Sequence, residues 1–189
     1  MNNRVYNDKV NVDDENIKAF FNNRAKRFAA GEVDQYTSVV LGDNKPDYGA
    51  EWHEFEKKQV VQHLNVGSDK KVLDIGCGIG RWAENIIDHC GEYIGTDFSD
   101  EMIKQAGERF KSYSNAVFIK NKKIIGRKFD TVIIAGISMY INDADLRKCY
   151  DSLTDILNEG AIVYIEESIG VNERLTLDHI WSDSLKDNY

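Results

Sequence analysis

The stretch that decides the fold is residues 72–82, Val72-Leu73-Asp74-Ile75-Gly76-Cys77-Gly78-Ile79-Gly80-Arg81-Trp82. A short apolar run that ends in spaced glycines is typical of a first strand turning into a first helix. Glycines let the backbone bend sharply and let a ligand approach the main chain closely. The helix that follows presents free N–H groups and the positive end of its dipole. The stretch therefore predicts a ligand site at the end of a strand.

Asp97 supplies the second part of this pattern. It ends the next apolar run, Tyr93-Ile94-Gly95-Thr96-Asp97. An acid at the tip of a second strand can accept hydrogen bonds from a ribose diol, and ligands of open α/β sheets bind at such carboxyl ends. The glycine stretch and Asp97 together predict an adenosine-containing ligand.

Strands and helices alternate outward from this stretch. Because the strands are apolar on both faces, we expect a mostly parallel sheet with helices on both sides, a three-layer α/β fold. The predicted strands are 72–75, 92–96, 116–119, 129–135 and 161–165. The predicted helices are 81–90, one that begins after an N-cap at Ser99, and 145–158, which ends at a C-cap at Gly160.

The residues before the sheet predict a helical lid. Residues 1–15 have the composition of a solvated arm, and amphipathic helices are expected at 16–29 and 50–64 with a short extended piece at 37–41 between them. Trp52, Phe55, Val60, Val61 and Leu64 are expected to face inward. We expect a single domain overall, with an arm and lid at 1–65 and a ligand-binding core at 66–189.

Composition excludes several classes of protein. The 189 residues carry a net charge of −8 and no long basic run, which disfavours binding to nucleic acid. The longest uncharged stretch, Thr131 to Asn142, is too short to span a membrane, and the polar N-terminus lacks a signal core. The three cysteines are scattered without metal-like spacing. We expect a cytoplasmic protein with no bound metal.

The ligand is narrowed by Asp74. Gly78-x-Gly80-x-x-Ala83 also fits the fingerprint of dinucleotide sites. A carboxylate just before the glycines, however, would lie close to the pyrophosphate of NAD or FAD, and Trp82 is bulky for close packing over that group. A carboxylate at this point suits a ligand that bears an ammonium group.

These residues resemble a known family. Asp74-x-Gly76-x-Gly78-x-Gly80 resembles motif I of the class I S-adenosylmethionine-dependent methyltransferases, and Asp97 resembles their acid after the second strand. Phe129-Asp130-Thr131-Val132-Ile133 is similar to their fourth-strand motif, and Leu157-Asn158-Glu159-Gly160-Ala161 to the turn before their fifth strand. The resemblance covers about residues 55 to 167. It implies a Rossmann-like methyltransferase sheet, S-adenosylmethionine as cofactor and S-adenosylhomocysteine as product.

The resemblance also implies which residues hold the cofactor. Asp74 and the glycine loop would hold the methionine part, Asp97 the ribose hydroxyls, and Arg24 the cofactor carboxylate. Asn121 stands where many members have an acid for the adenine amino group. The full implied set is Arg24, Asp74, Gly76, Cys77, Gly78, Gly80, Asp97, Phe98, Met102, Asn121, Ala135 and Gly136.

Catalytic candidates are expected at the ends of the fourth and fifth strands. Methyl transfer mainly requires that acceptor, methyl carbon and sulfur be aligned, and a hydroxyl acceptor would benefit from a general base. The candidates are Glu166, Glu167, Tyr140 and His179, with Tyr36 and His53 from the lid side. Glu166 and Glu167 are the favoured pair, because they follow the fifth strand at the sheet's carboxyl edge.

Three functions remain open at this point. The first is methyl transfer to a small polar acceptor, with O-methylation of a sugar or a similar metabolite favoured. The second is a noncatalytic adenosine-ligand-binding module or partner subunit, and the third, disfavoured by Asp74, is an NAD or FAD oxidoreductase. Family members usually end in an antiparallel hairpin, and residues 168–189 can hardly supply one. We therefore expect the natural protein to be longer, and we leave its oligomeric state open.

Overall fold

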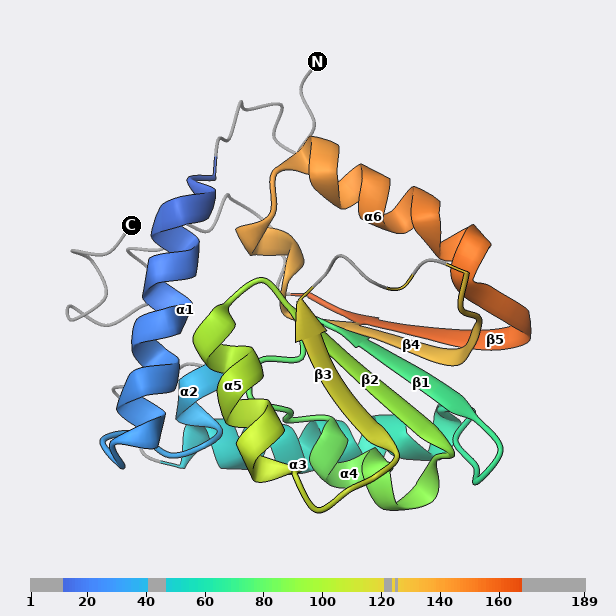
Figure 1. Ribbon diagram of the computed structural model, residues 1–189, viewed down its shortest axis with the longest axis horizontal. Helices are drawn as coiled ribbons and strands as arrows, with labels where there is room; N and C mark the ends of the chain where they lie inside the picture. Colours follow the sequence, from blue (N-terminus) through green and yellow to red (C-terminus); the bar gives the residue numbers. More distant parts are fainter. Residues whose placement is uncertain (1–11, 41–46, 121–123, 125, 168–189) are drawn as a thin grey trace.

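A computed structural model describes residues 12–40, 47–120, 124 and 126–167 of the chain (Figure 1). Its centre is a five-stranded sheet with the strand order β3-β2-β1-β4-β5. Every strand pair is parallel, as the apolar runs predicted. The strands are β1 (Lys71–Ile75), β2 (Glu92–Asp97), β3 (Ala116–Lys120), β4 (Phe129–Ala135) and β5 (Leu157–Glu166).

Helices cover both faces of the sheet (Figure 1). One face packs on α6 (Asp143–Ile156), and the other packs on α3 (Tyr48–Val60), α4 (Ala83–Ile86) and the end of α5 (Asp100–Arg109). α1 (Asp14–Ala29) runs beside α5, and α2 (Thr37–Val40) joins α1 to α3. Short 3-10 turns are η1 (Val61–His63), η2 (Ile87–His89) and η3 (Ser138–Tyr140). The predicted three-layer α/β fold with a parallel sheet is confirmed.

The core follows from the alternation of side chains along the central strands. Leu73, Ile94 and Val132 are fully buried on the α6 face. Their neighbours Val72 and Tyr93 are buried on the α3 and α4 face. Because both faces are covered, the middles of these strands are apolar, and at the carboxyl ends of β1 and β2 the polar residues include Asp74 and Asp97.

The expected extended piece at 37–41 was wrong for its described part, because residues 37–40 form α2. The Asp34 carboxylate accepts hydrogen bonds from the N–H groups of Tyr36 (2.7 Å) and Thr37 (2.9 Å) and so caps the turn. The Arg24 guanidinium binds the carbonyls of Thr37 and Ser38. The side chains of Asp34 and Arg24 thus provide hydrogen bonds to this short helix, and the sequence of residues 37–40 alone does not predict it.

The inward face expected for the second lid helix was partly wrong. Leu64 is buried, but Phe55 is 57% exposed and Trp52 is only partly buried. The side chains that α3 buries are instead His53 and Glu56. They are buried because polar partners on the glycine loop and α4 receive them, as described below.

Gly160 does not cap the helix before it. α6 ends at Ile156, Leu157 is already extended, and Gly160 lies inside β5 with a φ of 73°. The pairing of β4 with β5 shifts between Phe129 and Thr131, which places Gly160 in a bulge. Glycine suits this position because it adopts positive φ without strain.

Candidate functional site

The glycine loop after β1 has the conformation that its sequence predicted. Gly76, Gly78 and Gly80 all have positive φ, between 55° and 85°. A Cβ added at Gly76 would stand 2.4 Å from Cγ2 of Ile137, and one at Gly78 would stand 2.7 Å from Cγ1 of Val39. Glycine is therefore required both by the backbone conformation and by the neighbours that pack on the loop.

Two buried carboxyl groups lie beside this loop. Asp74 is the next-to-last residue of β1 and is 2% exposed, and Asp97 is the last residue of β2 and is 6% exposed. The Asp97 carboxylate accepts hydrogen bonds from the N–H groups of Gly78 (3.0 Å) and Ser99 (2.8 Å). The Tyr93 hydroxyl donates to Asp74 Oδ2 at 2.5 Å. The two acids thus line adjacent strand ends, as expected.

Burial controls the charge of both acids. It raises the pKa of Asp74 to about 7, although the Tyr93 hydrogen bond and the Arg81 charge act in the opposite direction. Burial likewise raises the pKa of Asp97 to about 6, against backbone hydrogen bonds from Ser99, Gly78 and Phe98. A bound cation would favour the ionised form of Asp74. This edge of the sheet is therefore suited to a positively charged group.

Helix α1, for which a lid role is predicted, packs against the residues that follow β2 and β4. The Phe21 ring lies edge-on to Tyr140 (5.0 Å between centroids) and to Phe98 (6.1 Å). Oδ1 of Asn22 accepts hydrogen bonds from the Ser99 hydroxyl at 2.7 Å and from the Glu101 N–H at 3.2 Å. α1 therefore bridges the loops that follow β2 and β4, the two loops implied to flank the cofactor.

Arg24 has a structural role on the same helix. It is 1% exposed and donates to the carbonyls of Thr37 and Ser38, and its guanidinium stands 5.5 Å from the centre of the Phe20 ring. These contacts join α1 to α2. The contact of Arg24 with a cofactor carboxylate stays a prediction.

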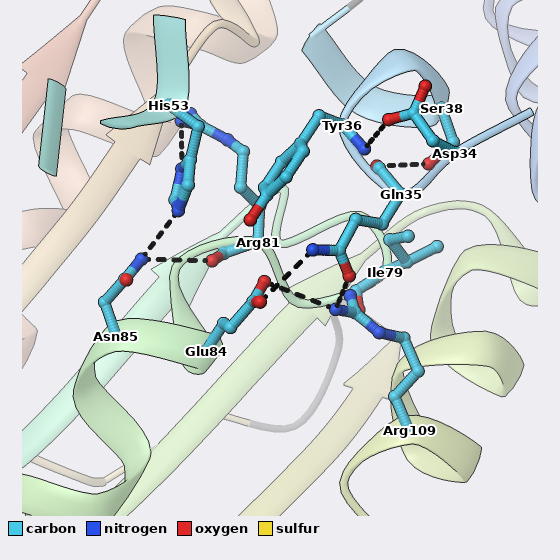
Figure 2. A network of polar contacts seen from close by, with 10 residues as sticks. All are labelled: Asp34, Gln35, Tyr36, Ser38, His53, Ile79, Arg81, Glu84, Asn85 and Arg109. Atoms are coloured by element: carbon cyan, nitrogen blue, oxygen red, sulfur yellow. Dashed lines mark hydrogen bonds and ion pairs between the residues drawn. The ribbon is translucent and has the colours of Figure 1, made fainter. Parts of the chain in front are cut away.

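A polar network attaches the α2 segment to the glycine loop (Figure 2). Arg109 donates to the Ile79 carbonyl and to Oε1 of Gln35, both at 2.6 Å, and its Nη2 lies 3.4 Å from Oε2 of Glu84. Nε2 of Gln35 donates to Oε1 of Glu84 at 3.1 Å. The Tyr36 ring stacks on His53 with 4.8 Å between centroids. Side chains of α3, α4 and α5 thus hold the segment before α2 close to the glycine loop.

The catalytic candidates differ in how many hydrogen bonds their side chains form with other residues. Both oxygens of Glu167 accept the Ser138 N–H, at 3.0 and 3.1 Å, and the Ser138 hydroxyl donates to one of them at 2.5 Å. Tyr140 is packed under Phe21, and burial raises the pKa of its hydroxyl. Within the described chain, no hydrogen bond or ion pair engages the half-buried Glu166 carboxylate. Burial, Glu56 and Glu167 raise the pKa of Glu166, and Arg81 lowers it.

Those remaining expected site residues that the structure describes lie around the same edge. Cys77 and Met102 are buried, and burial raises the pKa of the Cys77 thiol, so it is unreactive. Gly136 donates its N–H to the Glu166 carbonyl at 2.7 Å, directly after Ala135. Asn121 and His179 lie outside the described residues. Among the described residues, no group of three His, Cys, Asp or Glu side chains could hold a metal ion, and no helix there is long and apolar enough to cross a membrane.

Sequence reasoning missed a buried polar cluster between α3 and the sheet. Glu56 of α3 forms an ion pair with Arg81 of the glycine loop, and Tyr164 of β5 donates to Oε1 of Glu56 at 2.8 Å. His53 lies beside this pair, with its Nε2 3.0 Å from Nδ2 of Asn85 (Figure 2). The available signal was the polar pair His53 and Glu56, which shares one helix face with Val60.

Comparison with known proteins gives one family and several relatives. Residues 73–163 match the family model described as a methyltransferase domain. Phosphoethanolamine N-methyltransferase 1 of Triticum aestivum is 30% identical over 138 residues, which are 69% of this chain and 27% of that protein. Demethylmenaquinone methyltransferase of Staphylococcus saprophyticus is 28% identical over 153 residues, 77% of this chain and 65% of that protein.

Solved structures share the fold. Phosphoethanolamine N-methyltransferase 1 of Haemonchus contortus, in complex with phosphoethanolamine and S-adenosylhomocysteine, superposes with a TM-score of 0.65 at 18% identity, over 84% of this chain and 34% of that one. DhpI in complex with SAM and HEP gives a TM-score of 0.60 at 19% identity, over 84% and 67%. The chain thus spans about a quarter to two thirds of the length of these relatives.

Proposed function

We propose, from the premise that this chain carries the class I S-adenosylmethionine-dependent methyltransferase domain, that it transfers a methyl group to a small polar acceptor. The observation that carries this proposal is the pair of buried acids, Asp74 and Asp97, beside a glycine loop at adjacent strand ends. Two of the solved structures that share the fold contain bound S-adenosylhomocysteine or SAM.

The residues present fit this cofactor. Asp74 is a buried carboxyl whose hydrogen-bond partner is the neutral Tyr93 hydroxyl, so the ammonium of a methionine moiety would complete its electrostatics. Asp97 already accepts two backbone N–H groups and has lone pairs left for ribose hydroxyls. The pyrophosphate of a dinucleotide would instead meet the Asp74 charge.

Glu166 is the residue that we assign to the acceptor. When bound, S-adenosylmethionine supplies a methyl carbon that its sulfonium already activates. The protein's task is to align the acceptor and to take its proton. The Glu166 carboxylate is not engaged by a described partner, and burial makes it a stronger base than an exposed glutamate. It would accept the proton of an acceptor hydroxyl as that oxygen bonds to the methyl carbon and the carbon–sulfur bond breaks.

The favoured acceptor is a hydroxyl of a sugar or a similar polar metabolite. A base is needed most where the acceptor has a high pKa, as an alcohol has. One relative is named for N-methylation of phosphoethanolamine and another for methylation of demethylmenaquinone. These names do not decide whether the acceptor atom in this protein is oxygen, nitrogen or carbon. A cytoplasmic location also stays part of the proposal.

A ligand panel tests the proposal. Melting temperature would be measured with S-adenosylmethionine, S-adenosylhomocysteine, NAD and FAD, and we expect a rise with the first two only. Transfer of labelled methyl from S-adenosylmethionine to a metabolite mixture would then be compared for wild type and Glu166→Gln. Loss of transfer at least 100-fold, with cofactor affinity retained, is expected. Binding without transfer to any acceptor would favour a noncatalytic ligand-binding module.

A further inference from the structure

The buried cluster between α3 and the sheet has no part in the chemistry described so far. Glu56 is 3% exposed, and the side chain of its ion-pair partner Arg81 is 10% exposed. Removing two charges from water is costly unless they pair and their remaining groups find partners. The Tyr164 hydroxyl satisfies the second Glu56 oxygen at 2.8 Å, and the Arg81 guanidinium lies 5.2 Å from the centre of the Trp82 ring. A hydrophobic contact would fill this space at lower cost, so the charges call for an explanation.

The strand register gives the position of the cluster relative to the site. Asp74 pairs with Ile133, which pairs with Tyr164, so the three residues form one row across β1, β4 and β5. Glu166 stands two residues beyond Tyr164 and therefore on the same face of the sheet. The Glu56–Arg81 pair packs on this face from α3. It thus lies on the same side of the sheet as the carboxyl assigned to the cofactor and the carboxyl assigned to the acceptor.

Arg81 is the cation that acts on both of these carboxyl groups. The groups that influence Asp74 are Tyr93 and Asp97 from β2, Arg81 and Cys77 from the glycine loop, and Glu56 from α3. Those that influence Glu166 are Glu56, Arg81 and Glu167. In both sets Arg81 favours the ionised carboxylate and Glu56 opposes it. His53 also faces Arg81, but burial and Arg81 lower the pKa of its imidazole, so it adds no charge at neutral pH.

We propose that Glu56 and Arg81 are positioning residues that set the charge of the cofactor carboxyl Asp74 and the acceptor carboxyl Glu166 together. This inference rests on the proposed function. Arg81 favours the ionised form of Asp74, which binds an ammonium group, and Glu56 limits this effect by neutralising Arg81. Because Glu56 also binds Tyr164, the α3 helix fixes the distance between the pair and β5. Movement of α3 would therefore change the charge of both carboxyl groups, Asp74 and Glu166, at once.

The test is the pH dependence of S-adenosylhomocysteine binding, measured by calorimetry between pH 5.5 and 8. Affinity of the wild type should fall about tenfold per pH unit from a midpoint near 7 down to pH 6, as Asp74 takes up a proton, and more steeply below pH 6, where Asp97 also takes one up. Arg81→Met removes the cation and should raise this midpoint by roughly one pH unit. Glu56→Gln keeps the hydrogen bond with Tyr164, frees the Arg81 charge and should lower the midpoint. Glu51→Gln, an exposed acid on the same helix, is the matched control and should leave it unchanged.

Opposite shifts of the midpoint distinguish charge control from a merely structural role. A structural role would weaken binding in both variants by the same factor at every pH, and that result would overturn the proposal. If Arg81→Met does not fold, Arg81→Lys must retain the wild-type midpoint and Glu56→Gln must still lower it. Failure of the wild type to bind S-adenosylhomocysteine at any pH would instead refute the proposed function.

Discussion

At the scale of single residues, the charged forms of the two buried acids, Asp74 and Asp97, lower the stability of the fold but suit them to bind the ligand. The pKa of Asp74 is about 7 in the folded chain against an ordinary value of 3.8, so the folded state holds a proton that the unfolded state has lost. The contribution of Asp74 to stability is therefore most favourable at low pH, falls as pH rises from about 4 to 7, and then stays constant. Asp97, with a pKa of about 6, adds a smaller effect of the same sign.

Asp74→Asn should therefore stabilise the free protein. The amide has no charge to desolvate and can still accept the Tyr93 hydrogen bond. At pH 8 we expect unfolding to cost about 1–2 kcal/mol more than in the wild type. Denaturant unfolding across pH 4 to 8 measures this, and the difference should vanish near pH 4. Asp69→Asn, at an acid whose side chain is 80% exposed, is the control. An equal or lower stability of Asp74→Asn at pH 8 would contradict the assignment of a buried, costly charge.

At the scale of secondary-structure elements, short continuous apolar runs were enough to predict the sheet. All five strands and α1, α5 and α6 lie close to where the patterns placed them, although β5 begins at Leu157, four residues before its predicted start. The strands could be predicted because burial on both faces leaves a continuous apolar run. α2 was missed because it has only four residues and depends on Arg24, which is 14 residues from Ser38 in the sequence, and because the local capping signal of Asp34 was overlooked. The inward face of α3 was misassigned for the same reason, since Glu56 is buried by Arg81.

The β5 bulge gives a prediction with an internal control. Gly160 and Gly107 both have open space where a Cβ would stand, but only Gly160 has positive φ. Gly160→Ala should therefore destabilise the protein by about 1 kcal/mol through backbone strain. Gly107→Ala, inside α5, should stabilise it by about 0.5–1 kcal/mol. Thermal unfolding compares the two, and the same sign of change in both variants would contradict the bulge geometry.

The lid gives a prediction about exchange of backbone hydrogens. Gln35 joins the α2 segment to Glu84 and Arg109, so Gln35→Ala should speed amide exchange in residues 34–40 several-fold. S-adenosylhomocysteine should slow exchange in residues 16–29 of the wild type. Gln62→Ala, which removes only an exposed contact with the Lys58 carbonyl, is the control. Equal exchange rates in residues 16–29 with and without S-adenosylhomocysteine would contradict the interpretation of α1 as a lid.

At the scale of the whole molecule, the open edge of β5 predicts association. In the described part of the chain β5 pairs on one side only, with β4, and Ile162 and Ile165 are 38% and 48% exposed. Residues 161–165 of this edge are uncharged and β-prone, and such a segment pairs readily with another chain. We expect the 189-residue chain to associate at modest concentration and Ile165→Lys to reduce this, as measured by light scattering. Phe55→Lys, at an exposed apolar residue away from the edge, should have no such effect, and a stable wild-type monomer would refute the prediction.

The central claim is that the ends of β1 and β2 form a cofactor site for S-adenosylmethionine. Titration calorimetry of S-adenosylhomocysteine at pH 8, with wild type and Asp97→Ala, tests it most directly. The wild type should bind in the micromolar range, and Asp97→Ala should lose about 1.5–3 kcal/mol of binding free energy, because a charged partner of the ribose and of the Gly78 and Ser99 N–H groups is removed. Asp97→Asn should lose less. Equal affinity in wild type and Asp97→Ala, or tighter binding of NAD than of S-adenosylhomocysteine, would contradict the account.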